Sequence, residues 1–229
     1  MSGFFVTGTD TGVGKTLVAC ALLHALAERG LRVIGMKPVA AGASLRSGQL
    51  VNDDVSALKA AGNLAAPDHL VNPYCLAAPI APHVAAAQAG VMIELERLKR
   101  AYAQLTVLAD YVVVEGAGGF RVPLGPGFDT ADLAAQLRIP VVLVVGIRLG
   151  CINHALLTAA AIERAGLTFA GWVANHIDPD MICADESVQA LEERLAAPLL
   201  GRIPHAAGIG LTQAAALLAT DVLIGVQVR

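Results

Sequence analysis

The stretch GTDTGVGKT, residues 8–16, decides the fold of this chain. It follows a short apolar run at residues 4–6 and precedes an apolar, helix-like stretch at residues 17–26. A strand, a glycine-rich loop and a helix in this order are typical of a phosphate-binding loop, in which backbone N–H groups and the helix N-terminus face an anion. Lys15 would place its charge between the β- and γ-phosphates, and Thr16 would offer a hydroxyl to Mg²⁺. We therefore predict that this loop binds a nucleotide.

The spacing of the glycines departs from the common pattern in one place. That pattern has a glycine five residues before the Gly-Lys pair, where this chain has Thr9, and the glycine stands one residue earlier, at Gly8. The alternative is a glycine-rich turn that contains an unrelated lysine. Gly12, Gly14 and Lys15, placed between a strand and a helix, favour nucleotide binding over that alternative.

The length and composition indicate one large α/β domain over residues 1–229. The chain is 55% hydrophobic and has a mean hydropathy of +0.62. A membrane protein is the competing class, yet the strongest apolar run, residues 139–147, is too short to span a bilayer. A parallel sheet that is buried on both faces requires such short apolar strands.

Charge, cysteines and the first residues exclude further classes. The formal net charge is −3 and there is no long basic run, so nucleic acid is not an expected partner. The four cysteines are widely spaced and form no CxxC, which predicts reduced thiols and no zinc site. Residues 1–8 lack the basic segment and the apolar core of a signal peptide. We expect a cytoplasmic protein.

Strand and helix patterns alternate along the chain. The predicted strands are residues 4–6, 32–36, 111–114, 140–145, 169–174 and 199–203. The predicted helices are residues 14–30, 53 or 54 to 59, 83–89, 93–108, 129–137, 151–165 and 184–196, with one more from residue 211. Residues 44–52 are predicted to be a mobile loop, and residues 67–82 to be irregular. This alternation predicts a doubly wound, mainly parallel sheet flanked by helices, like that of P-loop NTPases, with ligands at the carboxyl ends of the strands.

Charged residues stand at two of these strand ends. Lys37 follows the second strand, where it is either a second cation for the phosphates or a solvated surface lysine. Glu115 closes a run of apolar residues, where a charge is costly unless it faces a metal or a partner. Asp54 is a second acidic candidate, but as part of Asn52-Asp53-Asp54 before a helix it reads equally well as an N-cap.

Two glycine-containing turns complete the candidate site. Gly116, Gly118 and Gly119 would let the backbone approach a ligand closely, or simply form a turn. Gly150, Cys151 and Asn153 open a helix after an apolar strand, which is a ready site for an anion. Asn153 would bond a carboxylate there or help to cap the helix. Cys151 is expected to be a small buried residue rather than a nucleophile.

Together these pieces resemble the dethiobiotin synthetase family. The resemblance covers residues 5–204, and it is carried by GTDTGVGKT (8–16), KPVAAG (37–42), NDD (52–54), NPY (72–74), VEGAGG (114–119), GCINHALLT (150–158) and GWVAN (171–175). It implies an ATP- and Mg²⁺-dependent ligase of biotin biosynthesis that acts as a homodimer. The reaction joins 7,8-diaminopelargonate and CO₂ into dethiobiotin through a carbamate and a carbamic–phosphoric anhydride, and releases ADP and phosphate.

The resemblance also implies roles for residues by position. The catalytic and carbamate-binding group is Thr11, Lys15 and Lys37. Mg²⁺ would lie among Thr16, Asp54 and Glu115. The ATP contacts would come from Gly12, Val13, Gly14, Lys15, Thr16, Gly116, Gly118 and Gly119, with Asn175, Pro204 and His205 at the adenine. Substrate contacts would include Ala41 and, from the other subunit, a turn formed by Gly150, Cys151 and Asn153 that receives the substrate carboxylate.

Two positions depart from the family pattern. Ala41 replaces a serine that often touches the substrate, so one hydrogen bond worth about 1 kcal/mol is missing or is supplied by water. His205 stands where a tryptophan is common, which puts adenine stacking in question.

Three other classes remain as alternatives. A ParA- or MinD-like regulatory ATPase would carry an additional lysine where this chain has Thr9. A cobyrinate-type synthetase would need a glutaminase partner, and a non-catalytic nucleotide-binding module would leave Lys37 and Glu115 unexplained.

Overall fold

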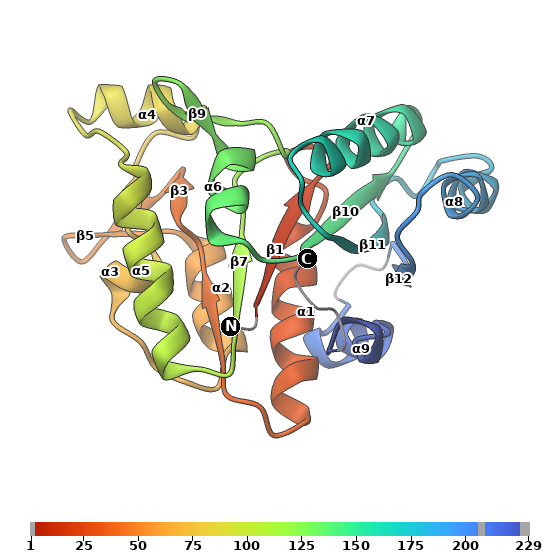
Figure 1. Cartoon of the computed structure of the whole chain (residues 1–229), viewed down its shortest axis with the longest axis horizontal. Coiled ribbons are helices and arrows are strands. Elements are labelled where there is room, and N and C mark those ends of the chain that lie inside the picture. The colour runs from red at the N-terminus through yellow and green to blue at the C-terminus, as the bar shows by residue number, and fades with distance from the viewer. Residues whose placement is uncertain (1–2, 206–208, 225–229) are drawn as a thin grey trace.

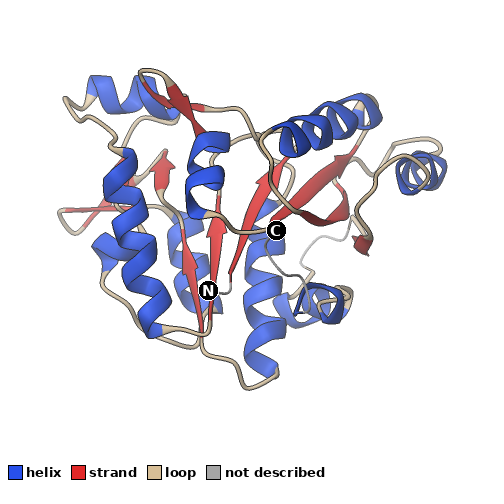
Figure 2. Ribbon diagram, in the orientation of Figure 1, coloured by secondary structure: helices blue, strands red, loops and turns tan. Residues whose placement is uncertain are grey.

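A parallel sheet of six strands, in the order β12-β11-β10-β1-β7-β2, runs through the centre of the molecule (Figures 1 and 2). The computed structural model describes residues 3–205 and 209–224. The strands of this sheet are β1 (Gly3–Gly8), β2 (Val33–Met36), β7 (Tyr111–Glu115), β10 (Val141–Ile147), β11 (Phe169–His176) and β12 (Leu199–Ile203). All neighbouring pairs are parallel, and the six strands match the six predicted from sequence.

Helices cover both faces of the sheet. They are α1 (Lys15–Glu28), α2 (Asp53–Ala61), α3 (Asp68–Val71), α4 (Pro82–Gln88), α5 (Leu95–Leu108), α6 (Thr130–Leu137), α7 (Cys151–Arg164), α8 (Ala184–Glu192), α9 (Leu211–Ala216) and α10 (Asp221–Ile224). Successive residues of β1 point to opposite faces: Phe5 joins the core under α5, α6 and α7, whereas Phe4 and Val6 join the core under α1, α2 and α9. The predicted doubly wound α/β fold is thereby confirmed.

The strand order brings the predicted loops to one edge. β1 lies between β7 and β10, and β2 pairs with β7. Because the strands are parallel, the loops after β1, β2, β7 and β10 all leave from the same edge of the sheet. The P-loop (residues 8–16) follows β1 and occupies the middle of that edge.

Two predictions about loops were wrong. Residues 44–52 contain a β-hairpin, β4 (Ser44–Arg46) and β5 (Gln49–Val51), joined by Ser47 and Gly48, which both have positive φ angles of 50° and 81°. Residues 67–82 are not irregular throughout, because they contain α3 and β6 (Tyr74–Leu76), which pairs with β3 (Val39–Ala41). A further two-stranded sheet joins β8 (Pro123–Gly125) to β9 (Phe128–Asp129).

Smaller differences concern helix ends. α1 ends at Glu28, and Gly30 follows in a left-handed conformation with φ 77°. α8 ends at Glu192 rather than at residue 196, and the segment from residue 211 forms two short helices, α9 and α10. Asp129 caps α6 through a capping box. In the part of the chain that the structure describes, no helix is long and apolar enough to cross a membrane.

Candidate active site

The P-loop has the backbone conformation that its glycines permit. Gly12 and Gly14 have φ angles of 75° and 89°, in the left-handed region that favours glycine. A Cβ added at Gly14 would also collide with the side-chain amide of Asn175. That amide is buried and donates a hydrogen bond to the Val13 carbonyl at 2.8 Å, so it is held in place.

The unusual glycine spacing also has a structural reason. The Thr9 N–H donates to the Val144 carbonyl at 3.0 Å, so the chain is still tied to β10 at this position. Thr9 is absent from the positive-φ residues among those the structure describes, and it therefore needs no glycine. At Gly8, in contrast, an added Cβ would lie 2.6 Å from Cγ2 of Val13. Close packing of the loop against its own strand requires glycine at position 8 and tolerates threonine at position 9.

We expect Gly14→Ala to weaken nucleotide binding at least about tenfold, because relieving the collision with Asn175 must move the loop amides. The left-handed backbone alone costs roughly 1–2 kcal/mol of unfolding free energy with alanine. Gly12→Ala is the matched control, since Gly12 is also left-handed but has open space at its Cβ position. Thermal unfolding and ADP titration check both variants. Equal losses in the two variants would show that the Asn175 contact is unimportant.

Lys15 is buried, and no carboxylate among the residues that the structure describes forms an ion pair with it. Its Nζ donates to the Asp10 carbonyl at 2.9 Å, within the P-loop itself. Burial, and next the nearby Lys37 charge, lower the pKa of Lys15 to about 8. An anion bound in the loop would stabilise the charged form of Lys15 and so raise its pKa.

Lys37 joins the two acidic candidates. It follows β2, and its buried Nζ lies 2.5 Å from Glu115 Oε1 and 2.8 Å from Asp54 Oδ2. Burial alone would lower the pKa of Lys37, but the two carboxylates, Glu115 first, raise it overall. Lys37 is therefore a buried cation at the P-loop, not a solvated surface lysine.

The backbone around Lys37 is held by its neighbours. The Lys37 N–H donates to the Val71 carbonyl at 2.8 Å, and the side-chain amide of Asn72 donates to the Lys37 carbonyl at 2.6 Å. The segment before β6 therefore fixes the strand end from which the lysine side chain departs.

Glu115 ends β7 and is 1% exposed. Its Oε1 accepts hydrogen bonds from Lys37 and from the hydroxyl of Thr16, the latter at 2.9 Å. Its Oε2 is buried and has no hydrogen-bond partner among the described residues. Burial raises the pKa of Glu115 despite the Lys37 charge beside it.

Asp54 is not the cap of its helix. The side chain of Asn52 caps α2 by accepting from the Val55 N–H, and Asp53 pairs with Arg46 on the surface. Burial opposes ionisation of Asp54, but pairing with Lys37 lowers its pKa overall. The N-cap interpretation of Asp54 is therefore wrong, and the structure places this carboxylate beside Lys37.

Thr16, Asp54 and Glu115 fit a magnesium ion. The buried Oε2 of Glu115 has no hydrogen-bond partner in the described part of the chain and lies near the first turn of α1. Asp54 and Thr16 supply two further oxygens nearby. Among the described residues, no three His, Cys, Asp or Glu side chains gather as a closed metal site. An ion held by one or two carboxylates and by substrate phosphates is the arrangement that Mg²⁺ prefers.

The loop after β7 packs on the P-loop. Gly118 has φ 62°, and a Cβ there would lie 3.5 Å from the Thr11 hydroxyl. A Cβ on Gly119 would lie 3.6 Å from the Gly8 carbonyl oxygen. Gly116 donates its N–H to the Val6 carbonyl at 2.9 Å. The structure thus brings this loop and the P-loop, including Thr11, together.

The remaining site residues lie at neighbouring strand ends. Gly150 is the left-handed N-cap of α7 with φ 93°, Cys151 is buried behind it, and Asn153 is exposed on the first turn. Asn175 lies in β11 against the P-loop. Pro204 and His205 are exposed beyond the end of β12, and Ala41 ends β3.

Comparison with known proteins places this chain in a family. Residues 2–220 match a family described as AAA domain. An ATP-dependent dethiobiotin synthetase from Aromatoleum aromaticum is 56% identical over 94% of this chain and 96% of its own length. A second, from Nitrosospira multiformis, is 56% identical over 89% of this chain and 88% of its own length. The chain belongs to the dethiobiotin synthetase family.

The fold of this family member is shared more widely. A MinC:MinD cell division protein complex from Aquifex aeolicus contains a chain with a TM-score of 0.61 and 17% identity, which covers 100% of this chain and 98% of that one. Similarity at this identity concerns the fold alone. The MinD-like alternative therefore gains no functional support from it.

Sequence reasoning missed two residues at the site of this dethiobiotin synthetase family member. Asp10 stands inside the quoted P-loop but has no role in the motif, and Arg148 follows β10. Their side chains form an ion pair at 2.6 Å. No local signal marks such a pair, because its members are 138 residues apart in the chain.

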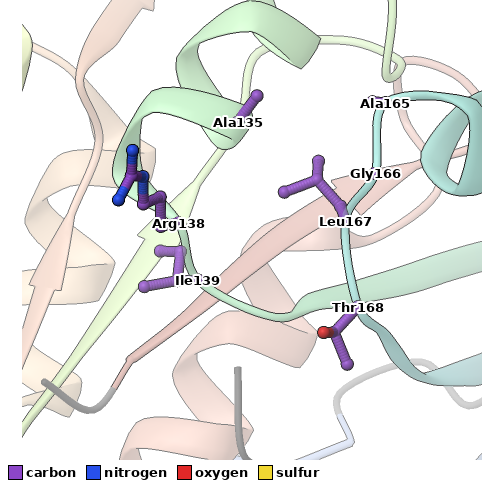
Figure 3. A pocket seen from close by; sticks show the side chains of 7 residues that line it. All are labelled: Ala135, Arg138, Ile139, Ala165, Gly166, Leu167 and Thr168. Carbon is purple, nitrogen blue, oxygen red and sulfur yellow. The ribbon is translucent and has the colours of Figure 1, made fainter. Parts of the chain in front are cut away.

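A cavity at the opposite edge of the sheet does not fit a nucleotide. Its volume is about 270 Å³, and Figure 3 shows its lining between the end of α6 and the segment after α7. Arg138 is the single charged side chain among the lining residues. This cavity lies at the amino ends of β10 and β11, whereas the P-loop is at the carboxyl ends.

Proposed function

We propose that this protein is an ATP-dependent dethiobiotin synthetase, which converts 7,8-diaminopelargonate, CO₂ and ATP into dethiobiotin, ADP and phosphate. One observation carries the proposal: Lys37, Asp54 and Glu115 converge on the P-loop helix of a chain that is 56% identical to such enzymes. A nucleotide switch or a binding module has no need of a second buried lysine at this place.

The chemistry needs positioning and charge rather than a protein nucleophile. One amine of the diamine adds to CO₂ and loses a proton, which gives a carbamate. A carbamate oxygen attacks the γ-phosphorus, the bond to ADP breaks, and a carbamic–phosphoric anhydride forms. The second amine attacks the carbonyl carbon, loses a proton and expels phosphate, which closes the ring. Each step develops negative charge that preorganised cations stabilise.

The chain's own residues divide this work. Gly12, Val13 and Gly14 present backbone N–H groups to the phosphates, and Lys15 adds its charge. Thr11 and Lys37 would hold the carbamate beside the γ-phosphate. Mg²⁺, held by Thr16, Asp54 and Glu115, would neutralise charge on the β- and γ-phosphates.

The ion pairs of Lys37 link metal binding to catalysis. In this structure the Lys37 ammonium pairs with the same two carboxylates that would hold the metal. Asp54 and Glu115 would hold the metal, and its positive charge would weaken their pairing with the Lys37 ammonium. The Lys37 ammonium would then be available to the carbamate and the γ-phosphate.

We propose a homodimer in which the Gly150 turn (residues 150–153) of one subunit receives the substrate carboxylate of the other. The exposed apolar side chains of Leu149 and Leu157, 92% and 64% exposed, support an interface beside this turn.

The adenine would be contacted by Asn175, Pro204 and His205. Because Ala41 has no hydroxyl group, the backbone or a water molecule would contact the substrate at this position. Free, widely separated cysteines support a cytoplasmic location.

A coupled assay tests the function. ATP hydrolysis is measured with and without diaminopelargonate and bicarbonate, and dethiobiotin is detected by its mass. The proposal requires hydrolysis to depend on both co-substrates and to match product formation. Robust hydrolysis without the diamine would instead favour the regulatory ATPase.

We expect nucleotide affinity to fall above pH 8 because of Lys15. The pKa of Lys15 is lowered to about 8 in the unliganded site, and bound phosphates would raise it. Below pH 8 the lysine is already charged, and affinity is constant. Above pH 8 binding must take up a proton, and affinity falls by up to about tenfold per pH unit.

Calorimetric titration of ADP at pH 7 and 9, in buffers with different ionisation enthalpies, measures this proton uptake. Lys15→Arg is the control, since its guanidinium stays charged over this range. Titrations of the wild type at pH 9 that show no proton uptake would contradict the assignment.

A further inference from the structure

An ion pair connects the P-loop to the end of β10. Arg148 Nη2 lies 2.6 Å from Asp10 Oδ2, and both side chains are nearly half-exposed. An ion pair with this exposure contributes little to folding stability. The effect that we expect from this ion pair is therefore on the relative position of the two loops it joins, rather than on the free energy of unfolding.

Asp10 makes three contacts that bear on the P-loop. Its Oδ1 accepts the Thr11 N–H at 2.7 Å, and its main-chain carbonyl accepts the Lys15 ammonium at 2.9 Å. Its Oδ2 is the oxygen that meets Arg148. Asp10 thus forms hydrogen bonds within the P-loop and also an ion pair with Arg148.

Arg148 in turn belongs to the start of α7. Its carbonyl accepts the Cys151 N–H at 3.0 Å, so its backbone is part of the turn that begins the helix. Gly150 is the N-cap of that helix and makes no side-chain capping bond. The turn before α7 therefore relies on contacts with other parts of the chain, such as the Arg148–Asp10 ion pair, for its position.

We propose that Arg148 is a positioning residue, which through Asp10 fixes the Gly150 turn against the P-loop of its own subunit. This inference rests on the proposed function, in which that turn receives the carboxylate of the substrate bound at the other subunit. Arg148 therefore serves the partner's site: the P-loop of each subunit orients the turn that it presents to its neighbour.

Kinetics of single variants give the first test. Arg148→Met is expected to raise the KM for diaminopelargonate about tenfold, with kcat and the KM for ATP changed less than about twofold, because loss of one charged anchor leaves the chemistry in place. Asp10→Asn should do the same, since asparagine still accepts the Thr11 N–H. The double variant should be no worse than either single one, and Arg148→Lys should restore part of the loss.

Arg32→Met is the matched control. Arg32 pairs with Asp110 at 2.8 Å on a similarly exposed surface, at the opposite edge of the sheet. The Arg32→Met variant should have the same kcat and the same KM values as the wild type. An unaltered diamine KM in Arg148→Met and Asp10→Asn would overturn the proposal.

Mixed dimers decide which site Arg148 serves. Subunits carrying Arg148→Met and subunits carrying Lys37→Met are given different tags, co-expressed and purified as heterodimers. The site of the Arg148→Met subunit then has an intact Lys37 and receives the Gly150 turn of a partner with an intact Arg148. The site of the Lys37→Met subunit lacks Lys37 and receives the turn of the Arg148→Met subunit. If Arg148 acts across the interface, the single working site has the wild-type KM for the diamine.

The other outcomes are equally distinct. A heterodimer that keeps the raised KM of Arg148→Met would overturn the cross-subunit role, as would a monomeric wild-type protein. A wild type that hydrolyses ATP without the diamine refutes the proposed function itself, and this result is obtained before any variant is made.

Discussion

Replacing Lys37 with methionine is expected to lower dethiobiotin formation by about 10³-fold, the loss typical of removing one preorganised group that stabilises charge in the transition state. Methionine fills a similar volume without the charge. Nucleotide affinity should change much less, since Lys15 and the loop amides remain. Single-turnover measurement of product checks the first effect, and ADP titration the second. Near-normal turnover would refute the catalytic role of Lys37.

The same variant leaves Glu115 buried with Thr16 as its remaining hydrogen-bond partner. Removing one member of a buried ion pair costs about 3–5 kcal/mol. The pKa of Glu115 is already raised by burial, and without Lys37 it rises further. A raised pKa in the folded state means that stability is retained at low pH and lost as the pH rises through that value. The variant should therefore approach the wild type in unfolding free energy as the pH falls below 4.5, the ordinary pKa of a glutamate.

A double variant separates folding from catalysis. Lys37→Met combined with Glu115→Gln removes both charges, so it should regain most of the unfolding free energy and remain inactive. A double variant that stays unstable would show that packing, rather than the buried charge, explains the loss.

Replacing Glu115 with glutamine is expected to weaken binding of Mn²⁺, used as a probe for Mg²⁺, by at least about tenfold in the presence of ADP. The variant loses the negative charge and the free Oε2 acceptor that favour a hard cation. Free Mn²⁺ is measured by electron paramagnetic resonance. Asp54→Asn should act in the same direction, while its exposed neighbour Asp53→Asn should have no effect.

Lys37→Met gives a prediction of opposite sign in the same assay. Because the Lys37 ammonium pairs with both carboxylates, its removal should tighten Mn²⁺ binding. Weaker metal binding in this variant would refute the exchange between lysine and metal, although the catalytic role of Lys37 would stand.

The architecture was predictable because its signals are local. Each central strand is a short apolar run bounded by turns, and the P-loop glycines mark the start of α1. Lys37 and Glu115 were predicted as site residues because parallel strands end at the same edge. For Lys37 this position left the surface alternative equally open, and the structure shows instead a buried side chain paired with Glu115.

The errors concern pairings between segments. The hairpin at residues 44–52 has exposed strands of three residues each, which are too short for an alternation of apolar and polar residues to identify them. β6 at residues 74–76 is three residues long and exists through its pairing with β3, more than thirty residues earlier. Such elements depend on their neighbours rather than on their own propensity.

By itself the sequence determined the class of fold, the nucleotide loop and the family, because each is written in contiguous motifs. Only the tertiary structure decided that Asp54 pairs with Lys37 instead of capping its helix, that Lys37 bridges both carboxylates, and that Asp10 contacts Arg148. The physical reason is the same in each case. The hydrogen-bond partners of a side chain depend on what the fold places within about 3 Å of it, and that distance is unrelated to separation along the chain.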